Sequence, residues 1–193
     1  MKTPKAPFRF APLCLALGLA FSGAQAATHA EFYAVFNPAA GQVPFPTNLF
    51  FSGSTDGTLN IPVADPTNLA DPKVAMNGLD GFSTVAPMTA NFSTTVKADT
   101  VKAGSTVRVF EVALNSSFAI TGVTGELKAG TDYSVNLLPQ DANQTTLNVH
   151  PLLPLKPKTG YLVVLTDGIQ DSAGYNALPS QTYALTKLTT PLV

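Results

Sequence analysis

The chain has 193 residues, of which 11 are Lys or Arg and 12 are Asp or Glu, and its formal net charge is −1. Charged residues make up only 12% of it and no basic run is present, which argues against nucleic acid as a partner. The hydrophobic content of 45% is that of an ordinary globular protein.

The first 26 residues have the pattern of an export signal. Lys2, Lys5 and Arg9 form a positive n-region, residues 10–21 form an apolar run, and a small-x-small pattern ends at Ala26. The apolar run is too short for a transmembrane helix, which takes about 20 residues. We therefore predict a signal peptide at 1–26, cleavage after Ala26, and a secreted protein that is extracellular or periplasmic.

The predicted cleavage also removes the only cysteine. Cys14 lies in the apolar run, and Leu13 precedes it where a lipid-attachment signal needs a small residue. The mature chain would have eight basic and twelve acidic residues, a formal net charge of −4, and no disulfide, so its core must be stabilised by packing. Attachment to the outer-membrane surface is left open, although no lipobox cysteine supports it.

Residues 27–89 are predicted to form an extended arm, rich in aromatic residues and proline, that packs on the core. Prolines interrupt the segment repeatedly and forbid a continuous helix. Burial of a large apolar side chain stabilises a fold by about 1.5–3 kcal/mol, so we expect burial of the many such residues here. They are Phe32, Tyr33, Phe36, Phe45, Leu49, Phe50 and Phe51.

The same segment carries the signals for one or two short helices. Asp65-Pro66 and Asp71-Pro72 each place an N-cap carboxylate before a proline at the first helical position. Gly78 suits the end of the second helix. Before them, residues 58–61 alternate between polar and apolar side chains and predict a short strand.

Residues 90–193 are predicted to form an immunoglobulin-like antiparallel β-sandwich, which makes the fold class all-β. The run 106–114 is apolar on both faces and predicts a central strand, and the run 145–150 places Leu147 and Val149 inward and Asn148 and His150 outward. Turn signals, most of them with a glycine, separate the runs, as is typical of such sandwiches. The predicted strands are 106–114, 131–138, 145–150, 161–166 and 182–188.

No catalytic, cofactor-binding or metal site is predicted, and no cofactor. His29 follows the predicted cleavage site and His150 lies on a polar strand face, neither with metal-ligand spacing to another ligand-type residue. The G-x-S-x-G motif of serine hydrolases is absent; residues 53–57 have threonine at the centre and predict a tight turn. Residues 167–172 resemble half of a calcium loop but lack its glutamate, so we expect a turn there too.

Two stretches carry a resemblance to a known family. They are residues 44–62, PFPTNLFFSGSTDGTLNIP, and residues 79–87, LDGFSTVAP. Together they resemble the N-terminal domain of bacterial virulence-factor lipases, the exported or surface-attached lipases and lysophospholipases of Gram-negative bacteria. Residues 155–161 and 167–174 are similar to the bacterial immunoglobulin-like module found in that domain.

The resemblance implies a larger parent, a serine lipase or esterase of lipid metabolism in which this region precedes an α/β-hydrolase domain. No residue of this chain corresponds to the parent's catalytic residues. The chain is therefore predicted to be a non-catalytic accessory module that supports or positions that hydrolase domain, its expected partner. Lipid or a cell surface is left open as a further partner.

A stand-alone immunoglobulin-like module that binds a cell-surface glycan, lipid or protein is the alternative, since such sandwiches often bind through loops or an edge strand. An intact enzyme is a third and weaker interpretation. Exposure of the aromatic residues at 32–51 distinguishes the first two. Buried aromatic residues favour the accessory module, whereas a solvent-exposed aromatic patch favours binding.

Overall fold

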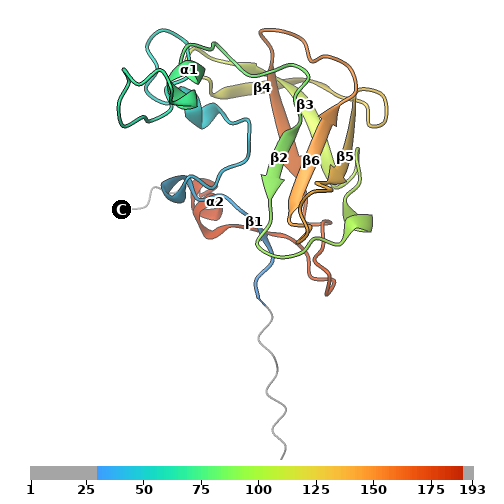
Figure 1. Ribbon diagram of the computed structural model, residues 1–193. Coiled ribbons are helices and arrows are strands. Elements are labelled where there is room, and N and C mark those ends of the chain that lie inside the picture. The colour runs from blue at the N-terminus through green and yellow to red at the C-terminus, as the bar shows by residue number, and fades with distance from the viewer. Residues whose placement is uncertain (1–29, 189–193) are drawn as a thin grey trace, which may run out of the picture.

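The computed structural model describes residues 30–188 and shows two antiparallel sheets packed face to face (Figure 1). Their strand orders are β2-β6-β5 and β4-β3-β7, and a short parallel pair, β1-β8, lies beside them. The strands are β1 (Tyr33–Ala34), β2 (Met88–Asn91), β3 (Val107–Leu114), β4 (Ile120–Glu126), β5 (Tyr133–Leu137), β6 (Thr146–Pro151), β7 (Gly160–Leu165) and β8 (Leu178–Pro179).

The helices are short. α1 spans Pro72–Met76 and α2 spans Gln181–Thr186, and single 3-10 turns lie at Pro38–Ala40, Asn48–Phe51 and Ala98–Thr100. The all-β prediction is confirmed, while the immunoglobulin-like assignment stays a prediction. The predicted signal peptide and His29 lie outside the described residues.

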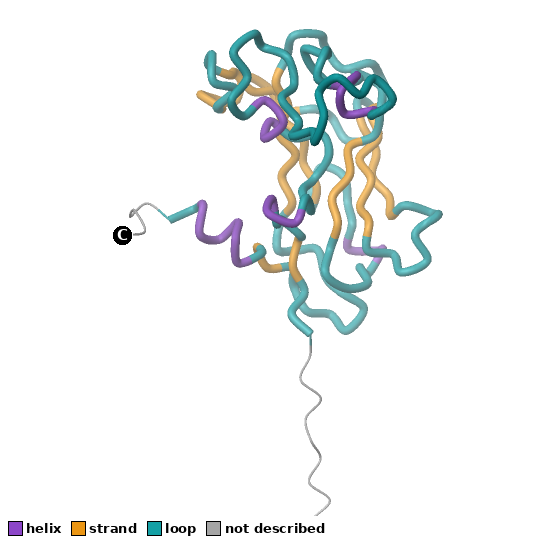
Figure 2. The backbone as a smooth tube through the Cα atoms, turned by 60° about the vertical axis from the view of Figure 1, so that its left-hand side comes forward, coloured by secondary structure: helices purple, strands orange, loops and turns teal. Residues whose placement is uncertain are grey.

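Four of the five predicted strands are present, as β3, β5, β6 and β7, and β3 lies in the centre of its sheet as predicted. The fifth prediction, a strand at 182–188, is wrong. Ser180 caps a helix there, because its hydroxyl accepts a hydrogen bond from the Tyr183 N–H at 3.2 Å. Figure 2 shows the resulting α2 standing away from the sandwich.

Strand β4, like β2, was not predicted. Its sequence, ITGVTGE, contains two glycines, which are depleted in strands, and almost all of its residues are exposed. It forms because it pairs with β3, and the register of this pairing shifts at Val112 and again at Leu114. Because nearly all of its residues are exposed, its sequence has no pattern of buried apolar positions from which a strand could be predicted.

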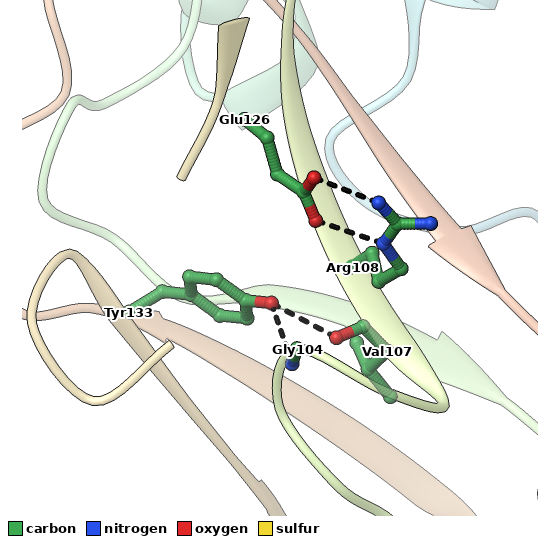
Figure 3. Close-up of polar contacts among 5 residues, drawn as sticks. All are labelled: Gly104, Val107, Arg108, Glu126 and Tyr133. Atoms are coloured by element: carbon green, nitrogen blue, oxygen red, sulfur yellow. Dashed lines mark hydrogen bonds and ion pairs between the residues drawn. The ribbon is translucent and has the colours of Figure 1, made fainter. Parts of the chain in front are cut away.

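The core lies between the two sheets and is closed by Tyr133. Its buried hydroxyl donates to the Val107 carbonyl and accepts from the Gly104 N–H, both at 2.9 Å, which ties β5 to the start of β3 (Figure 3). The predicted inward residues Leu147 and Val149 are 0% and 2% exposed. Asn148, predicted to face outward into solvent, is instead buried, and its Oδ1 has no hydrogen-bond partner among residues 30–188.

Two matching turns introduce β3 and β5. Lys102-Ala103-Gly104 and Lys128-Ala129-Gly130 each end on a glycine with positive φ, 77° and 75°. In each, the glycine N–H donates to a carbonyl three residues on, Val107 in one and Tyr133 in the other, at 2.9 Å. Only glycine adopts this backbone conformation without steric cost, so these residues fix where the two strands begin.

The N-terminal segment runs along the free edge of β2. Phe32 stacks on Phe92 with ring centroids 5.2 Å apart, and the backbone of Phe45 exchanges hydrogen bonds with Thr89 at 3.0 and 2.7 Å. Residues 44–82 then form a separate bulge, the aromatic lobe, which carries α1 (Figure 1). Its small core consists of Phe51, Leu59 and Ile61.

One or two short helices were predicted in the aromatic lobe, and of the two helix-start signals only the second leads to a helix. Asp71 caps α1 by accepting from the Lys73 N–H at 2.9 Å, whereas Asp65 accepts from the Thr67 N–H and hydroxyl in a turn that does not continue. The predicted strand at 58–61 is also absent, although its alternation is real, since Leu59 and Ile61 are buried and Asn60 is exposed.

Candidate functional site

A cleft of about 840 Å³ lies between the aromatic lobe and the sandwich. One wall is formed by the lobe, with Phe45, Phe51 and Phe82. The other wall is formed by strand β7 and by Leu147 and Val149 of β6, which belong to the sandwich core. The cleft is therefore lined mainly by apolar side chains.

The lobe wall is fixed by contacts between aromatic rings. Phe82 meets Phe45 and Phe51 edge-on, with centroids 5.6 and 5.9 Å apart. Phe118, from the loop between β3 and β4, stacks on Phe51 at 4.2 Å, and its carbonyl accepts a hydrogen bond from the Asn48 amide at 3.0 Å. Such ring pairs stabilise by about 0.5–1.5 kcal/mol beyond their burial, so this wall is preorganised.

Strand β7 forms the wall on the sandwich side and is an edge strand, because within residues 30–188 it pairs with β3 alone. All six of its residues are half-buried. Tyr161, Val163 and Leu165 face the core and Leu162 faces the opposite side, yet residues from both faces line the cleft. The cleft thus runs along the open edge of this strand.

The chain matches one protein family over nearly its whole length. The family model described as "bacterial virulence factor lipase N-terminal" matches residues 23–193, nearly the whole chain. The chain belongs to this family. Neither the curated proteins nor the solved structures contain a significant match to it. The family match confirms the resemblance that residues 44–62 and 79–87 predicted, and the chain is a lipase N-terminal region.

The charged residues that line the cleft of this lipase N-terminal region are Asp80, Lys156 and Lys158. Lys156 pairs with Glu111, whose carboxylate oxygens lie 2.7 and 3.0 Å from the Lys156 Nζ and raise the pKa of that ammonium. The Lys156 N–H also donates to the Tyr161 hydroxyl at 2.9 Å. Lys158 is exposed at the rim, without an ion-pair partner among residues 30–188.

The positions weighed as catalytic or metal sites have structural roles. The Ser54 hydroxyl donates to Asp56 and accepts from the Gly57 N–H, both at 3.2 Å, within the predicted tight turn. Hydrogen bonds from the Thr58 N–H and hydroxyl lower the pKa of Asp56. These contacts hold Ser54 and Asp56 in a turn rather than in a nucleophile–base pair.

The expected turn at 167–172 is present as well. Buried Asp171 accepts hydrogen bonds from the N–H groups of Ala173 and Tyr175 at 3.0 and 2.8 Å. Over residues 30–188, no cluster of three or more His, Cys, Asp or Glu side chains could hold a metal ion. Within the same range, no helix has the length and apolar character to cross a membrane.

The cleft itself was missed by the sequence analysis. The signal that could have found it is strand β7, whose sequence GYLVVL is apolar on both faces. Such a run is ordinarily a central strand covered on both sides. Here it is an edge strand, and all six of its residues are half-buried.

Proposed function

We propose that this chain is the non-catalytic accessory module of a secreted bacterial lipase or esterase, and that it supports and positions the hydrolase domain of the parent enzyme. The observation that carries the proposal is the family match over residues 23–193. Export by the predicted signal at 1–26 would place both parts of the lipase outside the cytoplasm.

The cleft supports this function. The apolar side chains of β7 that line it are only half-buried, such surface is stabilised when a partner covers it, and permanent partners have the most apolar interfaces. Among the described residues, only three charged ones line the cleft, Asp80, Lys156 and Lys158, and Lys156 is already paired to Glu111. An apolar part of the hydrolase domain therefore fits the cleft better than a polar ligand does.

The alternative, a stand-alone binding module, is less well supported. Phe32 and Phe51 are only 2% and 7% exposed, so the aromatic segment is largely ordered against the protein. Phe45 and Leu49, at 40% and 43%, are its main exposed apolar side chains. They lie at the lobe and do not form the broad aromatic platform that a surface-binding module would present.

Assays on short acyl esters test the proposal. Residues 27–193 alone should show no turnover. In the parent lipase, in which the hydrolase domain follows this region, deletion of residues 27–188 should lower the thermal stability of the hydrolase domain or its activity. Serine-dependent turnover by residues 27–193, or a parent enzyme unaffected by the deletion, would contradict the proposal.

A further inference from the structure

Strand β7 has a row of backbone groups without partners. The Thr166 N–H donates to the Thr106 carbonyl at 3.0 Å, and bonded and non-bonded pairs alternate along an antiparallel ladder. Gly160, Leu162 and Val164 therefore bond to β3. The N–H and C=O groups of Tyr161, Val163 and Leu165 point to the open side and have no hydrogen-bond partner within residues 30–188.

The other sheet edges differ from this one. The outer edge of β2 is covered by the N-terminal segment. The Asn91 carbonyl accepts from the Val35 N–H at 2.8 Å, and the backbone of Thr89 pairs with that of Phe45. The edge strand β4 is rich in Thr and Gly and pairs irregularly with β3, and the edge strand β5 is short and carries polar Ser134 and Asn136. Irregular pairing and polar residues are devices that protect an edge from association.

Strand β7 has neither protection. It carries no charged residue, its six-residue pairing with β3 is regular, and its apolar side chains line the cleft on both faces. Free backbone groups beside an apolar cleft that can hold alternate side chains are the arrangement by which a sheet edge takes up an extended peptide. An acyl chain would fill the apolar pockets but could not satisfy the backbone groups.

The charges at the ends of β7 add a constraint. Lys158 lies just before the strand and Asp167 just after it; both are exposed, and neither has an ion-pair partner among the described residues. A complementary strand would be apolar in its middle and would carry an acidic residue at the end that meets Lys158.

We propose that β7 is a docking edge and that an extended, largely apolar segment of the hydrolase domain adds to it as a further strand, with alternate side chains in the cleft. This inference rests on the proposed function, because it takes the hydrolase domain as the occupant. It defines how the partner binds, through strand addition at β7 and an acidic contact at Lys158.

Amide hydrogen exchange at single-residue resolution tests the inference. In residues 27–193 alone, the amides of Tyr161, Val163 and Leu165 should exchange rapidly, whereas those of Leu162 and Val164 are protected by β3. In the parent lipase, the three outward amides should slow by about 100-fold or more. Equal rates in the two proteins would overturn strand addition.

A proline substitution removes one outward N–H group without touching the ladder to β3. Val163→Pro should keep the fold and abolish the protection of Tyr161 and Leu165 in the parent lipase. Val135→Pro is the matched control, because by the same alternation the N–H of Val135 points to the open side of β5, away from the cleft. If Val163→Pro does not fold, Lys158→Glu replaces it, with Lys128→Glu as control, and should reduce the same protection.

The possible outcomes separate this inference from the proposed function. If deletion of residues 27–188 impairs the parent lipase while the β7 amides still exchange rapidly, the accessory role stands and strand addition is wrong. If residues 27–193 alone form a dimer that Val163→Pro dissolves and Val135→Pro does not, a second copy takes the edge and the inference fails. Binding of palmitate in the cleft without protection of these amides would also overturn it.

Discussion

The sandwich and the aromatic lobe are stabilised very differently. Among residues 30–188, the sandwich has eleven buried apolar residues in one continuous core, whereas the lobe has three, Phe51, Leu59 and Ile61. The lobe relies on ring contacts, on the backbone bonds of Phe45 to β2, and on Phe118 from the sandwich. The difference shows that the lobe is a dependent structure, and the cleft lies where this weaker region meets the stronger one.

The largest effect is expected in the sandwich core. Ile169 is fully buried, so Ile169→Ala should lower the free energy of unfolding by about 2–5 kcal/mol, through lost burial and a residual cavity. Chemical denaturation of residues 27–193 measures it. Leu69→Ala is the control, because Leu69 is 85% exposed and its truncation should leave the transition unchanged.

A matching truncation in the lobe should act locally. Leu59 is 2% exposed, but the small core around it limits the region that its loss can unfold. Leu59→Ala should speed amide exchange throughout residues 44–82 and leave the sandwich amides protected. If exchange accelerates equally in β3 and β6, the lobe and the sandwich unfold as one unit and the comparison is wrong.

A smaller effect is expected at the tyrosine that joins the sheets. Tyr133→Phe removes the hydroxyl between the Val107 carbonyl and the Gly104 N–H, a net loss of about 1–2 kcal/mol in unfolding free energy. The ring stays and the packing is retained. Unchanged stability in urea denaturation would show that the bond between Gly104 and Val107 alone satisfies both groups.

The smallest effect concerns pH. Asp141 accepts hydrogen bonds from the N–H and hydroxyl groups of Thr145 and Thr146 in the loop between β5 and β6, and these bonds hold its pKa well below the ordinary value. A lowered folded-state pKa stabilises the fold above the unfolded value of about 3.9 and this stabilisation is lost as pH falls. Asp141→Asn should therefore lower Tm at pH 7, and the difference should shrink in acid. A constant difference from neutral to acidic pH would contradict this.

Much of the sandwich was predictable from its sequence, because β-branched runs such as that of β7 and the glycine turns before β3 and β5 are local signals. Strand β4 and helix α2 were not. The first forms only through pairing with β3, and at the second the Ser180 cap overrides an apolar alternation that suited a strand. Propensity is a weak prior where such contacts decide the outcome.

The candidate site was the least predictable part. The aromatic residues at 44–62 were identified as a family motif and as side chains to be buried, but their arrangement as one wall of a cleft depends on Phe118, which lies far along the chain. The sequence likewise could not show that β7 is an edge strand. Edge position depends on which strands pair, and that is a property of the whole fold.

The central claim is that this region and the hydrolase domain of the parent lipase form one assembly through the cleft. The most direct measurement introduces a protease site between the two parts, cleaves the folded parent lipase and follows the fragments by size-exclusion chromatography. The account predicts that the cleaved parts stay associated and that Val163→Pro, unlike Val135→Pro, releases them. Fragments that separate at once, with the hydrolase part retaining full stability and activity, would contradict it.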